Sequence, residues 1–116
     1  MINEQIRQDL ADLGDRFEVV LFGSRVSGGA RPNSDYDIAI ITRNRNKEEN
    51  IQIQLDILKY YRREYDLRVF ELFPIHIQMN IIFNYVVIFG DPLEISEYFY
   101  QYRKIWRDCK NRIIQV

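Results

Sequence analysis

The stretch Val19-Val20-Leu21-Phe22-Gly23-Ser24-Arg25 decides the fold, because an apolar run of strand type, residues 17–22, ends within it at Gly-Ser. Eleven residues after Ser24 comes Asp35-Tyr36-Asp37, which leads directly into a second apolar run, residues 38–41. The segment between the two runs is polar and rich in glycine. The order strand, turn, strand is therefore predicted for this part of the chain.

The two aspartates predict a site for a metal ion. In a strand, residues i and i+2 point to the same face, so Asp35 and Asp37 project together while Tyr36 points away. Two neighbouring carboxylates repel each other unless a positive charge lies between them. A hard divalent cation fits, and magnesium is commonly bound by one or two carboxylates plus substrate phosphates. The Gly-Ser turn can supply backbone N–H groups and a hydroxyl to those phosphates.

A lone Asp-x-Asp is more often a solvated turn or strand end than a functional site. Four specified residues at fixed spacing, however, are expected by chance in only about one chain per thousand of this length. In this chain they also fall at the right places in the strand and turn pattern. The spacing of Gly23-Ser24 and Asp35-x-Asp37 therefore favours the functional interpretation.

The same residues resemble a known family. Gly23-Ser24, ten intervening residues and Asp35-x-Asp37 are similar to the signature of the minimal nucleotidyltransferases, the smallest members of the DNA polymerase beta superfamily. The resemblance extends over about residues 17–89, with one departure at Gly29, where many members carry an acidic residue. It implies an α/β fold with a nucleotidyltransferase-like mixed sheet of about four strands flanked by helices.

The third carboxylate of such a site has two candidates in this chain, Asp66 and Glu71. In the family an Asp lies eight residues before a proline, and an ungapped comparison places that proline at Pro74 and the Asp at Asp66. The same register puts the family's last strand on residues 85–89, although Asp66 can also be a strand-start residue after a turn. Arg68 and Glu71 depart from the more apolar family pattern. Glu71 therefore stays open as the third carboxylate or as a residue that contacts the metal ligands without binding the metal itself.

The activity implied by the resemblance is transfer of a nucleoside monophosphate, foremost AMP from ATP, to a hydroxyl, with release of pyrophosphate. Two Mg²⁺ ions are implied as cofactors, with ATP as the donor substrate. The implied nucleotide-binding residues are Gly23, Ser24 and Arg25. The implied metal-binding and catalytic residues are Asp35, Asp37 and Asp66.

The resemblance also implies a partner. Many minimal nucleotidyltransferases are antitoxins of HEPN-domain ribonuclease toxins, some by adenylylating the toxin on tyrosine, which favours a hydroxyl of a HEPN-type protein as the acceptor. Two alternatives stay open. The fold can serve as a non-catalytic binding module that neutralises a partner through a C-terminal helix, or as an enzyme that adds nucleotides to an RNA 3′ end. The oligomeric state is also open, and a homo-oligomer is one possibility.

Composition sets outer limits on these functions. The chain has 116 residues, which suits one nucleotidyltransferase domain over residues 1–116, with residues 92–116 as a helical extension. Sixteen Lys and Arg balance seventeen Asp and Glu, so the overall charge does not favour nucleic acid as a standing partner. The single cysteine is compatible with a reducing interior, and no apolar run approaches the length of a membrane span, which predicts a cytoplasmic protein without a membrane association.

Hydrophobic periodicity and turn residues predict the remaining elements. We expect helices over about residues 4–13, 24–27, 47–63, 74–84 and 92–112, and strands over about residues 17–22, 35–42, 65–73 and 85–89. Residues 31–34 are expected to form a turn, and the continuous apolar run over residues 85–89 is consistent with a buried strand. Residues 43–47 form a polar, basic loop, which is either a solvated connection or a contact for nucleotide phosphates or for an acidic target. The last helix carries aromatic residues interleaved with basic ones, a pattern of core packing, a protein interface or an RNA-binding surface.

Overall fold

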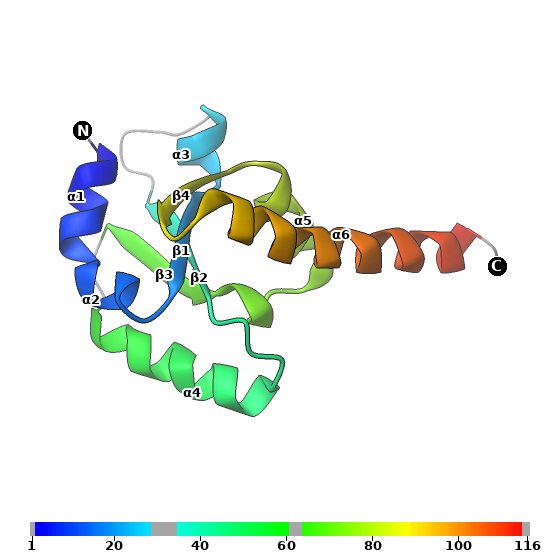
Figure 1. Cartoon of the computed structure of the whole chain (residues 1–116), viewed down its shortest axis with the longest axis horizontal. Helices are drawn as coiled ribbons and strands as arrows, with labels where there is room; N and C mark the ends of the chain where they lie inside the picture. Colours follow the sequence, from blue (N-terminus) through cyan, green and yellow to red (C-terminus); the bar gives the residue numbers. More distant parts are fainter. Residues whose placement is uncertain (1, 29–34, 61–63, 115–116) are drawn as a thin grey trace.

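The computed structural model describes residues 2–28, 35–60 and 64–114, and the strands within these ranges form one four-stranded mixed sheet (Figure 1). The strand order is β3-β2-β1-β4. The central strands β1 and β2 are antiparallel, β4 is antiparallel to β1, and β3 is parallel to β2. The strand bounds are β1 Glu18–Phe22, β2 Tyr36–Ile41, β3 Tyr65–Val69 and β4 Tyr85–Phe89. The predicted mixed sheet with flanking helices is confirmed, whereas the turn expected over residues 31–34 lies outside the described residues.

Helices occupy most of the described chain between the strands. The α-helices are α1 Ile2–Asp9, α2 Ala11–Gly14, α3 Ser24–Ser27, α4 Lys47–Ile57, α5 Ile75–Phe83 and α6 Pro92–Ile114, and two 3-10 helices are η1 Leu58–Tyr60 and η2 Phe70–Leu72. The single helix expected over residues 4–13 is divided at Leu10, where the chain bends toward β1. The helix expected over residues 47–63 ends at Ile57 and tightens into η1, and residues 61–63 lie outside the described part.

Two strands differ from their predicted form. The strand expected to run up to Pro74 ends at Val69, because the next three residues turn into η2 and carry Phe70 into the core. β4 has the predicted bounds, but it is an edge strand rather than a fully buried one, and only Ile88 among its residues is buried. Part of its outer edge is covered by α1, since the Arg7 guanidinium donates through Nε to the Ile88 carbonyl at 3.0 Å.

Each face of the sheet has its own hydrophobic core, because side chains alternate along the strands. The alternation is interrupted in β4, where a register shift against β1 puts both Ile88 and Phe89 on the same face. The helices α1, α2 and α4 cover the first face, which buries Ile6, Leu10, Leu13, Val19, Leu21, Ile38, Ile40, Ile57, Tyr65, Leu67, Val69 and Ile88. The helices α5 and α6 cover the second face, which buries Val20, Ala39, Ile41, Phe70, Met79, Ile81, Ile82, Ile95, Tyr98 and Phe99. Every strand residue can therefore be assigned to one of two faces.

The inner side of α4 is partly polar, although periodicity alone suggested an apolar one. Ile57 is buried, but Ile51, Leu55 and Leu58 are 40%, 55% and 50% exposed. Gln54 faces the sheet instead and binds the edge strand β3 with both ends of its amide. Its Nε2 donates to the Leu67 carbonyl at 2.9 Å, and its Oε1 accepts from the Val69 N–H at 2.7 Å. The side chain thereby stands in for the missing neighbour of the edge strand.

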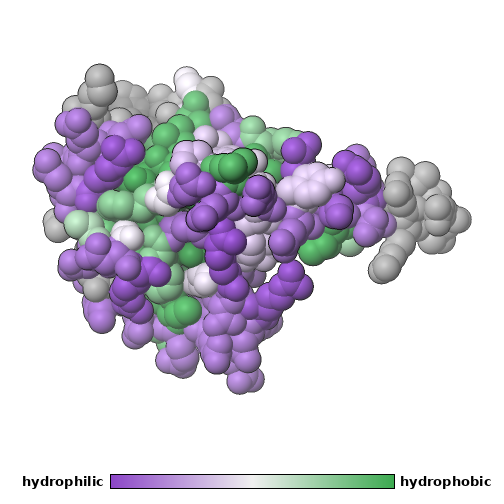
Figure 2. All heavy atoms as spheres, in the orientation of Figure 1, coloured by the Kyte–Doolittle hydropathy of each residue, from purple (hydrophilic) through white to green (hydrophobic). Residues whose placement is uncertain are grey.

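Helix α6 begins at Pro92, as predicted, and Asp91 caps its N-terminus. The Asp91 carboxylate accepts from the Glu94 N–H at 3.0 Å. The first half of α6 packs on the sheet through Ile95 and Phe99, and the second half projects away from the body (Figure 1). Figure 2 shows this projecting half as mainly hydrophilic, with a hydrophobic area on its lower side. Within the described residues, no helix is long and apolar enough to cross a membrane.

Candidate active site

The site begins at Gly23, which joins β1 to α3. Its φ of +84° lies in the region that glycine tolerates and other residues rarely adopt. A Cβ at this position would also collide with the Asp37 carboxylate, because Asp37 is the register partner of Phe22 on the neighbouring strand. The backbone of the Gly-Ser turn therefore passes directly against the Asp37 side chain. The close approach explains why a glycine is needed at this place.

Ser24 opens the short helix α3, whose predicted bounds of residues 24–27 are confirmed. The helix is fixed at its end by Gly28, which has a φ of +86° and donates its N–H to the Ser24 carbonyl at 3.1 Å. Ser24 is half-buried, and Val26 packs partly against the core of the first face. The side chain of Arg25 lies outside the described part of the structure.

The two central carboxylates of the site are brought together by strand register. Asp37 on β2 lies directly beside Asp66 on the parallel strand β3. Both alternate with residues of the first core, so both point to the second face, where α5 and α6 pack. Asp35 precedes β2 by one residue and is exposed. Tyr36 turns the other way, as the alternation predicts, and packs near Tyr65.

The electrostatics of Asp37 reflect this arrangement. Burial raises the pKa of the Asp37 carboxyl, and repulsion from Asp66 and then Asp35 raises that pKa further. The positive charge of Arg68 opposes the rise. Arg68 also forms an ion pair with Asp66, with 3.2 Å between Nε and Oδ1. Three negative charges and one positive charge therefore share one end of the sheet, and the excess negative charge favours binding of a cation.

The donor chemistry fits a divalent metal ion. Carboxylate oxygens are the ligands that magnesium prefers, and the protein usually supplies only one or two of them beside phosphate oxygens. Within the described residues, no three His, Cys, Asp or Glu side chains are gathered around one point as they stand. Asp37 and Asp66 lie side by side next to the Gly-Ser backbone. Two carboxylates are the number of ligands that the protein would supply in a magnesium site whose other ligands are phosphate oxygens.

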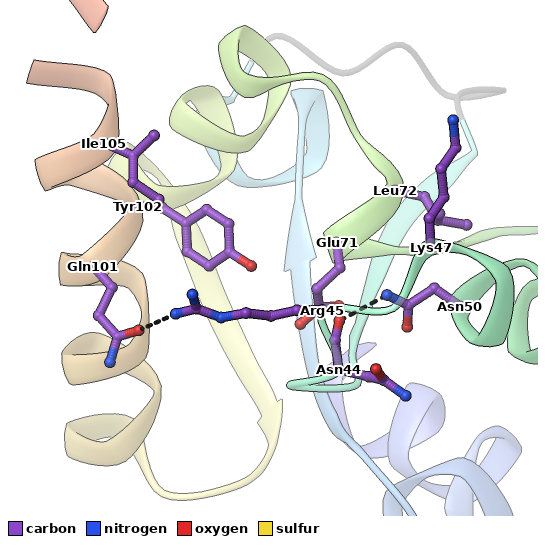
Figure 3. Close-up of a pocket in the computed structure, with 9 residues that line it drawn as sticks. All are labelled: Asn44, Arg45, Lys47, Asn50, Glu71, Leu72, Gln101, Tyr102 and Ile105. Atoms are coloured by element: carbon purple, nitrogen blue, oxygen red, sulfur yellow. Dashed lines mark hydrogen bonds between the residues drawn. The ribbon is translucent and has the colours of Figure 1, made fainter. Parts of the chain in front are cut away.

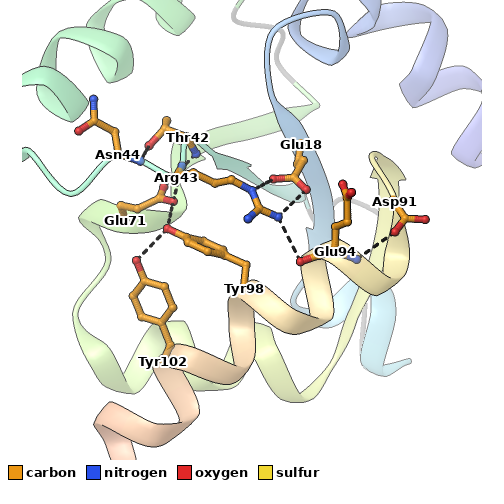
Figure 4. A network of polar contacts seen from close by, with 9 residues as sticks. All are labelled: Glu18, Thr42, Arg43, Asn44, Glu71, Asp91, Glu94, Tyr98 and Tyr102. Atoms are coloured by element: carbon orange, nitrogen blue, oxygen red, sulfur yellow. Dashed lines mark hydrogen bonds and ion pairs between the residues drawn. The ribbon is translucent and has the colours of Figure 1, made fainter.

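Glu71, the second candidate for a third carboxylate, lies at the other end of β2 (Figure 4). Its carboxylate accepts hydrogen bonds from the backbone N–H groups of Thr42 and Arg43, at 3.1 and 2.9 Å. The Tyr98 hydroxyl donates to the same carboxylate at 2.6 Å. The strand expected over residues 65–73 ends at Val69, so Glu71 belongs to η2 and does not lie on β3 with Asp66.

The network around Glu71 is held by Arg43, a non-glycine residue with a φ of +59°. Its guanidinium pairs with Glu18 at 2.5 Å and donates to the Glu94 carbonyl at 3.1 Å. The guanidinium carbon also lies 4.7 Å from the centre of the Tyr98 ring. These contacts join β1, the end of β2 and α6, so the role of the network is structural.

A cavity of about 320 Å³ lies beside this network (Figure 3). The basic loop that follows β2 lines one side of it, and α6 lines the other. Arg45 reaches across the cavity and donates to Gln101 on α6 at 3.2 Å. The lining residues include none of the three candidate metal-binding aspartates, so the loop over residues 43–47 lies away from the site that phosphates would occupy. The lining is Asn44, Arg45, Lys47, Asn50, Glu71, Leu72, Gln101, Tyr102 and Ile105.

Sequence reasoning did not include Arg68 among the site residues. The signal was present, because Arg68 follows Asp66 by two residues in a strand and must share its face. Arg68 departs from the apolar pattern of the strand, but its meaning depends on β3 lying in register with β2, which the sequence alone does not show.

Comparison with known proteins identifies the family. The profile of the polymerase beta nucleotidyltransferase family matches residues 4–92. A protein of Methanocaldococcus jannaschii, provisionally named a protein adenylyltransferase, is 43% identical over 97 residues, which are 84% of this chain and 75% of that protein.

Solved structures share the fold. A chain from the crystal structure of a toxin-antitoxin with AMP-PNP superposes with a TM-score of 0.60 at 18% identity and full coverage of both chains. A second structure contains the tri-AMPylated HEPN toxin of Shewanella oneidensis in complex with an MNT antitoxin. It matches with a TM-score of 0.63 at 12% identity, over 95% of this chain and 87% of that one. The family match and the shared fold agree with the resemblance carried by the Gly-Ser and Asp-x-Asp residues: the chain belongs to the polymerase beta nucleotidyltransferase family.

Proposed function

We propose that this nucleotidyltransferase moves AMP from ATP to a hydroxyl of a partner protein in a magnesium-dependent reaction. The observation that carries the proposal is the register of Asp37 with Asp66 on adjacent parallel strands, directly beside the backbone of Gly23. This juxtaposition places two hard oxygen donors next to a turn that can approach a triphosphate closely. Adenylyl transfer to protein is also the activity in the name of the relative from Methanocaldococcus jannaschii.

The proposed reaction is an in-line displacement at the α-phosphorus of ATP. A bond forms between the acceptor oxygen and the α-phosphorus, the bond from that phosphorus to the bridging oxygen of the β-phosphate breaks, and pyrophosphate leaves. Gly23 and Ser24 hold the β- and γ-phosphates, with Arg25 beside them. Bound Mg²⁺ supplies charge neutralisation for the leaving pyrophosphate and lowers the pKa of the attacking hydroxyl.

The carboxylates have separate tasks in this proposal. Asp35 and Asp37 hold the metal ions. Asp66 completes the set from the neighbouring strand and takes the proton of the acceptor hydroxyl, because its side chain is partly exposed and an acceptor can reach it. The proton balance closes when Asp66 returns that proton to water after pyrophosphate has left.

The partner in this proposal is a HEPN-type toxin, for which the chain acts as the antitoxin. The support comes from the fold, since the solved toxin-antitoxin structures contain chains of the same architecture.

The decisive experiment is incubation of the purified protein with Mg²⁺ and α-phosphate-labelled ATP, with and without the protein encoded beside it, followed by mass analysis of every protein. We expect one or more AMP additions on the partner, and we expect the Asp37→Ala variant to lose them. The Arg45→Gln variant serves as a control, because Arg45 lies in the cavity at the other end of β2. A partner that stays unmodified while the wild-type protein binds Mg²⁺ and ATP would contradict the acceptor assignment.

A non-catalytic binding module is the second candidate function. The exposed side of α6 favours it, since Tyr100 and Ile105 are 48% and 46% exposed on a helix that projects from the body (Figure 1). An RNA-binding role of α6 is less favoured. Lys104 lies over the ring of Tyr100 and Lys110 over the ring of Trp106, so these two aromatic faces are already covered and are less available for stacking with RNA bases. A stable complex with the partner but no AMP transfer under any condition would favour the binding module.

A further inference from the structure

Arg68 lies inside the carboxylate cluster of the site without having a place in the proposed chemistry. It follows Asp66 by two residues on β3, so both side chains point to the second face of the sheet. Its Nε donates to Asp66 Oδ1 at 3.2 Å. Its register partner on β2 is Ala39, a residue too short to contribute a competing polar group. The Asp66 carboxylate is therefore the described partner of the guanidinium.

The position of Arg68 matters because of the charges around it. Asp35, Asp37 and Asp66 carry three negative charges when ionised, and one guanidinium among them reduces the net charge to minus two. Arg68 is close to both paired carboxylates, since it forms an ion pair with Asp66, which lies directly beside Asp37 on the neighbouring strand. The guanidinium of Arg68 is permanently charged, so it repels any divalent cation that approaches the same carboxylates.

A nucleotide changes this balance. The triphosphate brings several negative charges, which attract both the incoming cation and the guanidinium. The planar guanidinium is suited to phosphate oxygens as well as to a carboxylate, so Arg68 keeps a partner when the cation reaches Asp66. Its side chain is 60% exposed, which leaves it free to follow the phosphates without unpacking the core.

We infer that Arg68 is a positioning residue that stands in for the metal ion at Asp66 in the nucleotide-free protein and makes cation binding depend on the nucleotide. This inference rests on the proposed function, because it assumes that Asp37 and Asp66 bind the cation. It assigns Arg68 the task of holding the carboxylates in place while suppressing the binding of a bare divalent cation. The cation then enters together with the triphosphate.

The test measures Mn²⁺ binding by the electron paramagnetic resonance signal of free Mn²⁺, with and without the non-hydrolysable analogue AMP-PNP. Without the analogue, Arg68→Gln should bind Mn²⁺ about three- to tenfold more tightly than the wild-type protein, because one repelling charge is removed. The gain in Mn²⁺ affinity that AMP-PNP produces should be smaller in Arg68→Gln by a similar factor. Arg68→Lys should stay near the wild-type values, since it keeps the charge.

Arg45→Gln is the matched control, with the same change of charge at the other end of β2, and it should bind Mn²⁺ like the wild-type protein. Thermal unfolding verifies that each variant is folded. An affinity of Arg68→Gln for bare Mn²⁺ within twofold of the wild-type affinity, or weaker, overturns the inference, and so does Mn²⁺ binding undetectable in both proteins.

The Asp37→Asn variant separates the two levels of the proposal. Loss of Mn²⁺ binding in Asp37→Asn, with no effect of Arg68→Gln, leaves the proposed function standing and removes only the role of Arg68. Mn²⁺ binding that survives in Asp37→Asn contradicts the metal site itself, and the Arg68 inference falls with it.

Discussion

The Tyr98 hydroxyl donates a hydrogen bond of 2.6 Å to the Glu71 carboxylate, and this contact ties α6 to the turn that follows β3. The same carboxylate accepts from two backbone N–H groups at the end of β2. Burial raises the pKa of the Tyr98 hydroxyl, and its hydrogen bond to Glu71 raises that pKa further, so Tyr98 stays protonated and remains a donor. Glu71 thus serves the assembly of the fold, which leaves Asp66 as the proposed third carboxylate of the site.

Substitution of these two acids separates stability from activity. In Glu71→Gln an NH₂ group replaces one of the two accepting oxygens, so at least one of the three donors loses its acceptor. We expect the free energy of unfolding to fall by about 1–3 kcal/mol. AMP transfer should remain near the wild-type rate. Asp66→Asn should abolish transfer with little loss of stability. Urea unfolding and the labelled-ATP assay measure the two effects. The reverse pattern would make Glu71 the third carboxylate.

The Gly23→Ala substitution tests the close approach of the turn to Asp37. The added Cβ would meet the Asp37 carboxylate, and a φ of +84° is strained for alanine. We expect AMP transfer to fall at least about tenfold, because displacement of a catalytic group by an ångström has effects of that order or larger.

Gly28→Ala is the control for this test. Gly28 has nearly the same φ, +86°, but its Cβ would meet no atom within 4 Å. Gly28→Ala carries a backbone cost of about 1–2 kcal/mol, because Gly28 is in the left-handed helical region. Gly23→Ala carries at least as much, about 1–3 kcal/mol, because a ψ of -156° puts Gly23 in a region that is essentially restricted to glycine. Thermal unfolding should therefore show a loss in each variant. Equal losses of AMP transfer in the two variants would mean that backbone strain, rather than the contact with Asp37, limits the enzyme.

The raised pKa of Asp37 predicts a pH-dependent stability difference. Above this raised pKa, the Asp37 carboxylate is ionised in both states and its burial and repulsion destabilise the folded state. As the pH falls toward the unfolded value of 3.8, the folded state takes up the proton first and the penalty disappears. In metal-free buffer, Asp37→Asn should therefore melt at a higher temperature than the wild-type protein at pH 7. The difference in melting temperature should shrink toward zero at about pH 4, and a difference that does not depend on pH would contradict this account.

The amide of Gln54 supports a prediction about the edge strand. Gln54→Ala removes the partner of the Val69 N–H and of the Leu67 carbonyl, and we expect a loss of about 1–3 kcal/mol in the free energy of unfolding. Gln52→Ala, on the exposed side of the same helix, should cost little. Hydrogen exchange at the Val69 amide should accelerate in Gln54→Ala only.

Much of the fold could be predicted from the sequence, because β1, β2, β4 and the start of α6 have unambiguous local signals. The strand bounds follow continuous apolar runs, and Gly90-Asp91-Pro92 marks a helix start by its turn, cap and first-turn residues. The inner side of α4 could not be predicted, since Gln54 is drawn inward by unpaired backbone groups of β3. Such a tertiary demand has no counterpart in the periodicity of the helix.

The candidate site shows the same division. The spacing of Gly23-Ser24 and Asp35-x-Asp37 indicates candidate residues, and the spacing to Pro74 in the family pattern indicates Asp66. Only the pairing of β2 with β3 brings Asp66 beside Asp37 and Arg68 into the cluster. The domain limits, with residues 92–116 as an extension, and the cytoplasmic location stay predictions.

The strand order has a consequence for synthesis on the ribosome. β1 is a central strand, but one of its neighbours, β4, is made only after β2, β3 and, in the described part of the chain, the α-helices α3, α4 and α5. A nascent chain that has emerged as far as Val69 can already align Asp37 with Asp66, yet one edge of β1 stays open until residues 85–89 appear. Pairing between such distant segments is slow and leaves an aggregation-prone edge exposed in the meantime. The nascent protein therefore acquires the framework of its chemistry before its protective outer strand.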